Sequence, residues 1–241
     1  MMLKLNFFNA ISAKSAPTDE SVLSLLVKPV KLRIILVRHG ETDWNNQNRL
    51  QGSTDVPLND KGKLQAEKVS TFLKNVPIHQ AFSSSLLRAK DTASIILQHH
   101  NIALETRPAL AEIHRGHWQG MTLEEIEIQY REQFNLWRKH PHRLQNYSGE
   151  TLQSASDRVW TEWHNLLNSS QSQLKFRNVL VVAHEGVNRL LLCRLTGLSL
   201  SKFWEVPQHN TALNAIDYPW GIRGMSRVRV KNFVIPDNCH Y

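Results

Sequence analysis

The sequence predicts an α/β fold, a three-layer sandwich in which helices cover both faces of a mostly parallel central sheet. Short apolar runs rich in Ile, Leu and Val alternate with longer segments of helical periodicity, as in proteins built on a parallel sheet. Two of these runs, 34–37 and 179–183, are apolar at every position, which is typical of strands buried on both faces. The 241 residues, 41% of them hydrophobic, are enough for one sizeable core.

Strands and helices alternate along the whole chain. We expect strands at 34–37, 78–82, 103–106, 178–183, 210–217 and 226–234. We expect helices from Asn59 or Asp60 to Leu73, from Ser83–Ser85 to Leu97, at 122–139, at 151–168 and at 189–195. The polar residues 46–60 form a loop, and loops of this length in a compact domain tend to be functional. Residues 109–120 form a second loop that carries Glu112, and the helix at 122–139 is expected to cover the site as a cap.

We expect a flexible N-terminal extension at residues 1–30 and a single domain at residues 31–241. The first 30 residues show no sustained periodicity. Their apolar stretch is too short for a signal peptide, and they contain no Arg for a transit peptide. A start codon assigned too early is the alternative to an extension, and we assign the segment no function.

The apolar runs and the cysteines bear on the location of the protein. No apolar run approaches the roughly 20 residues that a membrane-spanning helix needs. The two cysteines, Cys193 and Cys239, are too far apart along the chain to form a disulfide framework, which is typical of a reducing compartment. We therefore expect a cytoplasmic protein with no membrane partner.

The formal net charge of +8 and the isoelectric point of about 9.7 leave two interpretations open. A basic surface can attract a polyanion such as nucleic acid or an anionic small molecule, or it can be a generic solvated surface. Lys and Arg are spread along the chain, and only residues 222–231 are locally dense, in a segment that alternates as a strand does. We expect no nucleic acid partner, and RNA binding through the basic surface is the alternative.

Two histidines occupy the same position relative to a buried strand. Arg38 and His39 follow the first apolar strand, and His184 follows the strand at 178–183; a Gly lies close behind each histidine. The carboxyl ends of parallel strands meet at one edge of a sheet, where α/β proteins bind their ligands. One such junction can be a hydrogen-bonded loop pair, but two junctions in one chain predict that both histidines face a single crevice.

Several known chemistries are excluded by spacing. His184 and Glu185 begin like a zinc-protease motif, but Asn188 stands where the second His ligand is needed. The Arg of a cysteine-phosphatase loop is replaced by Ser199 after Cys193. The chain has no Walker loop and no G-x-S-x-G serine nucleophile motif. The other closely spaced histidines have no accompanying cluster of Cys or carboxylate ligands, so we expect no metal.

Five segments, taken in order, resemble the histidine phosphatase superfamily and, within it, the phosphoglycerate mutase-like branch. They are LVRHGETDWN, RLQGSTDVPLNDKG, SSSLLRAKDTA, EIHRGHWQG and VVAHEGVNR. They lie within residues 32 to about 217, nearly the whole predicted domain. The resemblance implies a phosphoglycerate mutase-like fold and an enzyme that acts on phosphate esters without a metal or other cofactor.

The resemblance also implies roles for eight residues. One group takes part in phosphoryl transfer: His39 as the nucleophile, Glu112 as the proton donor, and Arg38, Arg88 and His184 as ligands of the phosphoryl oxygens. A second group helps to bind the substrate: Asn45, Gln51 and Gly52. Glu41 and Glu185 also lie beside the histidines, so they are the alternatives to Glu112 as the catalytic carboxylate.

The chemistry of these side chains supports the same roles. A phosphate monoester is close to dianionic at pH 7, and the planar guanidinium of Arg binds two of its oxygens while staying charged. A nucleophilic His must be neutral; its reference pKa of about 6.5 leaves most of it neutral at pH 7, and nearby guanidiniums lower that pKa further. The leaving alkoxide needs a proton, which a carboxylic acid kept protonated by the phosphate charge can supply.

The expected reaction is metal-independent hydrolysis of a small phosphorylated metabolite, a phosphomonoester, through a phosphohistidine at His39. A phosphoglycerate mutase is the alternative, but the 71 residues between Glu112 and His184 are few beside the cap insertions of true mutases. A catalytically inactive phosphate-binding or scaffolding protein would be expected to lack His39 or an Arg, and neither is missing. The sequence identifies neither the metabolite nor whether the protein is a monomer or a homodimer.

Glu185 departs from the family pattern, because many relatives have Gly after the second histidine. A carboxylate at this position that pointed into the site would repel a phosphate or recruit a cationic group of the substrate. A carboxylate that pointed outward would be harmless. The substrate preference therefore depends on where this side chain lies.

Overall fold

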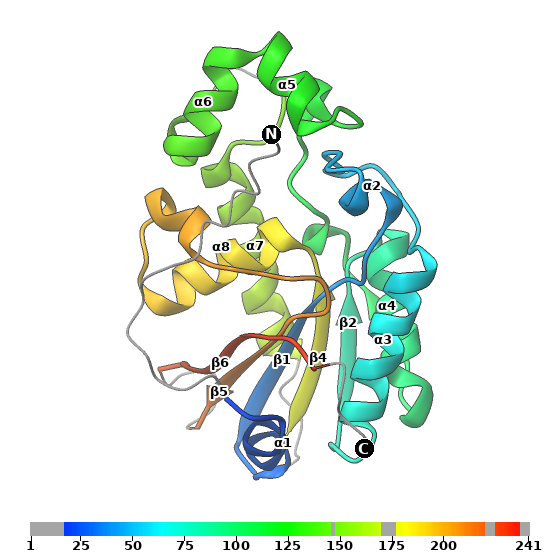
Figure 1. Cartoon of the computed structure of the whole chain (residues 1–241). Coiled ribbons are helices and arrows are strands. Elements are labelled where there is room, and N and C mark those ends of the chain that lie inside the picture. Colours follow the sequence, from blue (N-terminus) through cyan, green and yellow to red (C-terminus); the bar gives the residue numbers. More distant parts are fainter. Residues whose placement is uncertain (1–16, 146–147, 170–176, 220–224, 237–241) are drawn as a thin grey trace.

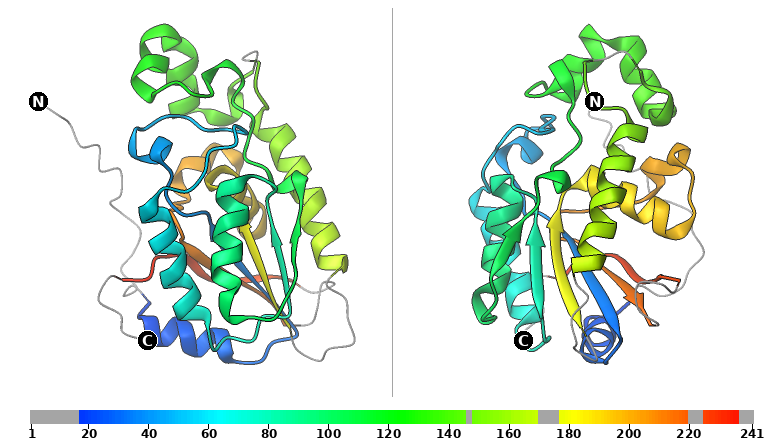
Figure 2. Two further views of the ribbon diagram at one scale, coloured as in Figure 1. Left: turned by 90° about the vertical axis from the view of Figure 1, so that its right-hand side faces the viewer. Right: turned by 180° about the vertical axis from the view of Figure 1, so that it is seen from behind.

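A computed structural model describes residues 17–145, 148–169, 177–219 and 225–236, and they form a three-layer α/β sandwich (Figures 1 and 2). In this part of the chain a six-stranded sheet has the order β3-β2-β4-β1-β5-β6. The strands are β1 Leu32–Arg38, β2 Gln80–Ser83, β3 Leu104–Thr106, β4 Asn178–Ala183, β5 Leu213–Tyr218 and β6 Arg227–Phe233. β1, β4, β2 and β3 pair in parallel, whereas β5 is antiparallel to β1 and to β6. The predicted mostly parallel sheet is confirmed.

Strands β1 and β4 form the centre of the sheet and bring the two histidines together. Every residue of both strands is buried, as their unbroken apolar runs predict. Their pairing is in register up to the last residues, where Arg38 faces Ala183. The next residue of each strand is a histidine, so His39 and His184 leave the sheet side by side.

Helices cover both faces of the sheet because each presents one apolar side to it. Helices α3 Asp60–Leu73 and α4 Leu87–Ile96 pack on one face, and α7 Leu152–Ser169 and α8 Glu185–Thr196 pack on the other (Figure 1). The two apolar clusters are separated by the sheet, with Phe72 in the first and Trp163 in the second. Short 3-10 helices connect these elements: η1 Leu97–His99, η2 Pro108–Leu110, η3 Gly116–Trp118, η4 Pro141–Arg143 and η5 Leu200–Glu205.

The expectation of a flexible extension over residues 1–30 is wrong for residues 19–27. These residues form helix α1 Asp19–Val27, which begins at the N-cap Thr18. Val22 and Leu26 are fully buried in the core, on the face of the sheet that α3 and α4 cover. Arg33 of β1 holds the end of the helix by donating to the carbonyl of Leu25 at 2.5 Å. Residues 1–16 lie outside the described residues.

The cap is two helices rather than the single helix expected at 122–139. Helix α5 Leu123–Gln129 and helix α6 Arg131–Lys139 meet at Tyr130, whose ψ of 44° interrupts the helical path. Phe134 and Trp137 of α6 pack against Trp118 in a small apolar cluster of their own. The cap, together with the short helix α2 Asp43–Asn46, lies beyond the carboxyl ends of β1 and β4 (Figures 1 and 2).

The remaining differences are small shifts at element ends. Helix α8 begins directly at Glu185, with His184 as its N-cap, and not at residue 189. The closing strands are shorter than expected, and of the locally basic segment 222–231, residues 222–224 lie outside the described residues. Among the helices that the structure describes, none is both long enough and apolar enough to cross a membrane.

Candidate active site

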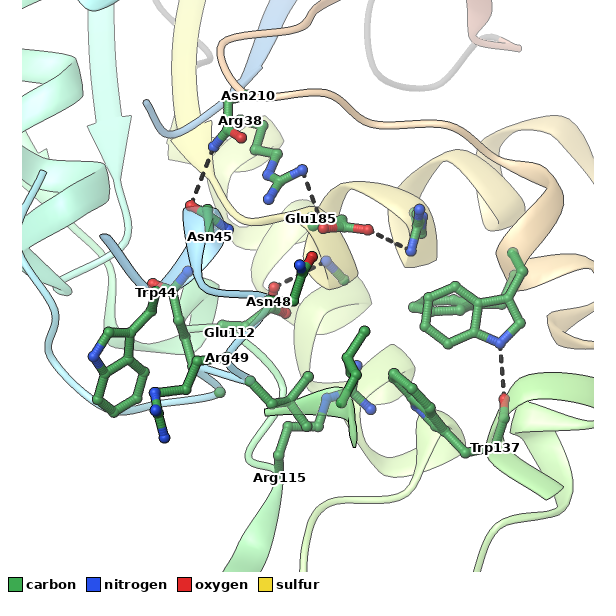
Figure 3. A pocket seen from close by; sticks show the side chains of 18 of the residues that line it. Arg38, Trp44, Asn45, Asn48, Arg49, Glu112, Arg115, Trp137, Glu185 and Asn210 are labelled. Carbon is green, nitrogen blue, oxygen red and sulfur yellow. Dashed lines mark hydrogen bonds and ion pairs between the residues drawn. The ribbon is translucent and has the colours of Figure 1, made fainter. Parts of the chain in front are cut away.

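A cavity of about 1190 Å³ lies between the carboxyl ends of the central strands and the cap (Figure 3). Seven of the eight residues predicted from the sequence line it: Arg38, His39, Asn45, Gln51, Gly52, Arg88 and Glu112. The eighth, His184, is fully buried beside His39, with the two ring centroids 5.2 Å apart. The structure therefore brings all eight residues to one place, although they come from five separate segments of the chain.

His39 has its ring fixed in one tautomer. Its Nδ1 lies 2.6 Å from the carbonyl oxygen of Gly40. A carbonyl can only accept, so Nδ1 carries the proton and Nε2 keeps its lone pair in the neutral ring. Burial, followed by the positive charges of Arg88 and Arg38, holds the pKa of His39 well below its ordinary value of 6.5. At neutral pH the ring is an uncharged base with its free nitrogen at Nε2.

Gly40 is required by a close approach of two backbones. A Cβ at this position would overlap the carbonyl oxygen of Gly62 in helix α3, and a backbone oxygen cannot move aside as a side chain can. The amide of Gly40 donates to the hydroxyl of Thr92 at 3.0 Å. The turn after His39 is thus fixed by α3 and α4, and this explains the Gly that comes after the first histidine.

Arg88 is held by the polar loop that follows α2. Its guanidinium donates to the carbonyls of Gly52 and Thr54, both at 2.7 Å. The carboxylate of Asp55, in the same loop, accepts from the amide of Leu87 at 2.7 Å and so caps the start of α4. Burial lowers the pKa of Arg88 to about 10, which leaves it charged at pH 7. The sequence predicted a functional loop here but did not identify the role of Asp55.

Buried polar side-chain atoms without partners belong to two arginines and a histidine at this end of the cavity. Among the described residues, Arg38 Nε, Arg88 Nε and both ring nitrogens of His184 have no hydrogen-bond partner. Burial, together with the charges of Arg88, His39 and Arg38, keeps the pKa of His184 well below 6.5. A buried polar group left without a partner costs about 1–3 kcal/mol, and more when it is charged. Such a convergence of unpaired donors is suited to an anion with several oxygens, such as a phosphoryl group.

Glu112 is positioned by the second junction. Its Oε2 accepts from the amide of Gly186 at 3.0 Å, and its Oε1 accepts from the amide of Ile113 at 2.8 Å. Gly186 lies in the first turn of α8, where the helix dipole favours a carboxylate. A Cβ on Gly186 would overlap Oε1 of Glu112, so the Gly is needed for this approach. Of the alternatives, Glu41 does not line the cavity and instead pairs with Lys61 at 2.7 Å.

Glu185 points into the cavity rather than outward. Its carboxylate bridges Arg38 Nη1 at 3.0 Å and Arg189 Nη1 at 2.6 Å (Figure 3). Burial by itself raises the pKa of Glu185, but the charges of Arg38, Arg189 and Arg115 outweigh that effect and leave the pKa below its ordinary value. The negative charge is therefore balanced within the protein, and part of Arg38 is engaged before any substrate arrives.

The three residues predicted to bind substrate differ in how far their side chains are engaged. Asn45 uses its Oδ1 to accept from the amide of Thr42 at 3.1 Å, which closes a capping box at the start of α2. Gln51 is buried, and its Oε1 has no partner among the described residues. Gly52 has a φ of +52°, and a Cβ there would overlap the side chain of Gln119.

The outer part of the cavity contains residues that the sequence analysis missed. Basic and aromatic side chains line it: Trp44, Arg49, Arg115, Trp137, Arg138, Lys139, Arg189 and Trp204. They come from α2 and the loop after it, from the loop after Glu112, from the cap, from α8 and from η5, and they have no common spacing in the sequence that would group them. Within the described ranges, no group of three or more His, Cys, Asp or Glu side chains could hold a metal ion.

The matched region of the chain decides its family. The histidine phosphatase superfamily (branch 1) matches residues 34–229, which is most of the chain. The chain belongs to the histidine phosphatase superfamily. The match includes both strand-to-histidine junctions, the polar loop and the cap, and it confirms the resemblance seen in the sequence.

Relatives within the superfamily include phosphatases and a mutase. The chain is 34% identical to phosphoserine phosphatase 1 of Hydrogenobacter thermophilus over 185 residues, covering 77% of this chain and 86% of the relative. It is also 34% identical to the 2,3-bisphosphoglycerate-dependent phosphoglycerate mutase 2 of Gloeobacter violaceus over 170 residues, 69% of this chain and 76% of the relative. Among solved structures, YhfR of Bacillus stearothermophilus superposes with a TM-score of 0.78 at 27% identity, covering 85% of this chain and 98% of that chain.

Proposed function

We propose that this member of the histidine phosphatase superfamily is a metal-independent phosphatase that hydrolyses a small phosphomonoester through a phosphohistidine on His39. The observation that carries the proposal is the pairing of a neutral His39, with its lone pair at Nε2, with unpaired donors on Arg38, Arg88 and His184. A nucleophile and an oxyanion receptor next to each other are the two parts that phosphoryl transfer to a protein side chain requires.

In the first half of the proposed reaction, Nε2 of His39 attacks phosphorus and the bond from phosphorus to the ester oxygen breaks. The leaving oxygen takes a proton from Glu112, which faces the same cavity. The guanidiniums of Arg38 and Arg88 and the ring of His184 bind the phosphoryl oxygens throughout. The charges of the two guanidiniums balance the negative charge of the phosphoryl group in the buried part of the cavity, where such interactions are stronger than in water, and the neutral ring of His184 contributes a hydrogen bond.

In the second half, water attacks the phosphohistidine and gives up a proton to the Glu112 carboxylate. The bond from phosphorus to Nε2 breaks, His39 returns to its neutral form, and inorganic phosphate is released. The hydrogen bond from Nδ1 to Gly40 stays in place during both halves, so the ring keeps its orientation. One pocket thus serves both steps without any further cofactor.

The proposal is tested by incubating the purified protein with a panel of phosphorylated metabolites and p-nitrophenyl phosphate, in excess EDTA. Phosphate release that is lost in His39→Ala supports it, and so does a phosphoprotein trapped by alkaline quench whose stability to alkali and lability to acid assign it to histidine. O-phosphoserine belongs in the panel because a relative is named a phosphoserine phosphatase. Absence of release from every ester would overturn it and leave a mutase or an inactive phosphate-binding protein as the explanation.

Mutase activity is a second candidate, favoured by the relative that is named a phosphoglycerate mutase. It is measured with 3-phosphoglycerate and a bisphosphate primer, under the conditions of the phosphatase assay. Isomer formation faster than phosphate release would show that the phosphohistidine is passed back to substrate rather than to water. The short chain between Glu112 and His184 favours hydrolysis, because a smaller cap shields the intermediate from water less completely.

A further inference from the structure

The cavity contains a buried cation, Arg115, that forms no ion pair with the described residues. Its side chain lines the same cavity as His39 and is only 6% exposed. Its Cζ lies 5.8 Å from the ring centroid of Trp137, on the cap side of the pocket (Figure 3). Within the part of the chain that the structure describes, the guanidinium of Arg115 also makes no hydrogen bond, and only its backbone amide donates to a neighbour. Its side-chain donors are therefore unused.

Two of the neighbouring cations of the cavity, Arg49 and Arg189, differ from Arg115 in this respect, whereas Arg138 and Lys139 line the cavity from exposed positions of α6. Arg49 pairs with Glu125 and donates to the carbonyl of Gly120. Arg189 pairs with Glu185 and donates to the carbonyl of Val206 at 2.8 Å. These partners balance the charge of the two guanidiniums within the protein, which the described residues do not do for Arg115.

The carboxylate of Glu185 does not serve as the counterion of Arg115. The charge of Arg115 contributes to the lowered pKa of Glu185, so the two groups interact at a distance. The oxygens of Glu185, however, are already paired with Arg38 and with Arg189. Arg115 is thus close to a negative charge that is bound elsewhere.

A buried guanidinium without a paired anion is unfavourable, because burial removes the water that would solvate its charge. The face of Trp137 offers some compensation, since an aromatic ring attracts a cation. It leaves the N–H donors at the edge of the guanidinium unused, and these donors form the fork that binds a carboxylate or a phosphate. The position is thus prepared for an anion that arrives from outside.

We propose that Arg115 binds a second anionic group of the substrate, a carboxylate, and so selects phosphomonoesters that also carry one; this inference rests on the proposed phosphatase function. In the proposed function, two arginines and two histidines surround one phosphoryl group. A single unpaired guanidinium matches a monoanion, and its planar fork fits the two oxygens of a carboxylate. A second phosphate would call for more positive charge than Arg115 alone supplies, and Arg138 and Lys139, which also line the cavity, are exposed to water rather than buried beside it.

The experiment compares pairs of esters that differ in one carboxylate. The pairs are O-phosphoserine against O-phosphoethanolamine, and 3-phosphoglycerate against glycerol 3-phosphate, so that the effect is measured with and without an amine. We expect the wild type to favour the carboxylate-bearing member of each pair by roughly 10- to 100-fold in kcat/KM, chiefly through KM, as for a charge-assisted hydrogen bond. In Arg115→Met this ratio falls towards one, and in Arg115→Lys it is intermediate.

The control variant is Arg131→Met, which removes the same charge from an exposed position of the cap and should keep the wild-type ratio. A ratio near one in the wild type, with His39-dependent release from p-nitrophenyl phosphate, would overturn the assignment of Arg115 and leave the proposed function intact. Absence of phosphate release from every ester with the wild type would instead overturn the proposed function. The second phosphate is tested by comparing kcat/KM for propanediol bisphosphate and its monophosphate. A gain in kcat/KM larger than the gain from a carboxylate would overturn the choice of a carboxylate.

Circular dichroism shows whether Arg115→Met is folded. If it is not, competitive inhibition of the wild type decides the question, with phosphonoacetate compared with methylphosphonate. Tighter inhibition by phosphonoacetate supports a carboxylate subsite, and equal inhibition contradicts it. A structural role for Arg115 would lower activity on both members of a pair equally, so the ratio separates that role from substrate binding.

Discussion

The two strand-to-histidine junctions look alike in sequence but differ in their hydrogen bonds. At the first, the ring of His39 is committed through Nδ1 to the carbonyl of Gly40. At the second, both ring nitrogens of His184 have no partner among the described residues. The same pattern of buried strand, histidine and nearby glycine thus produces one ring with a fixed tautomer and one ring that is free to choose its own.

The difference arises from the backbone conformation just after each histidine. After His39 the chain turns into a loop, and the next carbonyl comes back against the ring. After His184 helix α8 begins at once, and the carbonyl of His184 accepts the first hydrogen bond of the helix, from the amide of Asn188 at 2.9 Å. A helix N-terminus offers amides rather than acceptors, which leaves the second ring without a backbone partner but supplies the amide that holds Glu112.

Because only His39 has its lone pair fixed at Nε2, replacing each histidine should have a different consequence, and these are the largest effects that we expect. We expect His39→Ala to lose activity by about 10⁴-fold or more, since no other side chain replaces the nucleophile. We expect His184→Ala to lose about 10²- to 10³-fold, as for the removal of one oxyanion donor. Protein quenched in alkali measures the difference directly: phosphoprotein should form in His184→Ala and be absent from His39→Ala. Phosphoprotein in both variants would contradict the assignment.

Glu112 is held at the second junction by the hydrogen bond that it accepts from the amide of Gly186. The loss of activity on its removal should depend on the leaving group of the ester. We expect Glu112→Gln to lower kcat by about 10²- to 10⁴-fold for alkyl phosphates, which need a proton on the leaving oxygen. The loss should be smaller, about 10-fold, for p-nitrophenyl phosphate, because nitrophenolate leaves without a proton. The ratio of the two rates in each protein is the measurement. Equal losses on both esters would place the proton donor elsewhere.

Replacing the glycine that follows each histidine with Ala should affect activity at one junction and stability at the other. In Gly186→Ala the new Cβ overlaps the Glu112 carboxylate and the buried side chain of Ile113, so we expect about 10²-fold less activity with a smaller loss of stability than in Gly40→Ala, because the atoms it meets belong to side chains. In Gly40→Ala the Cβ meets the backbone of Gly62, so we expect unfolding to become easier by about 1–3 kcal/mol. Thermal melting and turnover of both variants separate the two effects. A destabilised Gly186→Ala with normal turnover would show that Glu112 adjusts.

The fold and the inner site were open to prediction from sequence because their signals are local. The apolar runs of β1 and β4 identify buried strands, and a histidine at the end of each indicates a crevice. Helix α1 was missed because its two core residues, Val22 and Leu26, are too few to establish a period in a segment of mixed composition. Its packing depends on contacts with distant strands, which a short window of sequence does not contain.

The outer site and its pairings could not be predicted, for a related reason. Arg115 and Trp137 meet only because α6 folds back over the loop after Glu112. The direction of the Glu185 side chain results from its ion pairs with Arg189, four residues later, and with Arg38, which is distant in the sequence. The i,i+4 spacing to Arg189 is visible in the sequence, but the contact with Arg38 is not. Long-range contacts decide which charges are satisfied and which remain available to a ligand.

The charge that distinguishes the two junctions is Glu185, and its removal has the smallest expected effect. The carboxylate is paired with Arg38, so in the proposed mechanism it competes with phosphate for this guanidinium and also repels a nearby dianion. In Glu185→Gln we expect inorganic phosphate to inhibit about 3- to 10-fold more tightly, as for the loss of a partly exposed ion pair worth about 1 kcal/mol. The control is Glu205→Gln, which removes a carboxylate at the same cavity that is paired with exposed Lys202, and a change below about twofold is expected there. Weaker inhibition in Glu185→Gln would show that the carboxylate positions Arg38 for phosphate rather than competing with it, because a guanidinium released from its partner would then bind the anion less well.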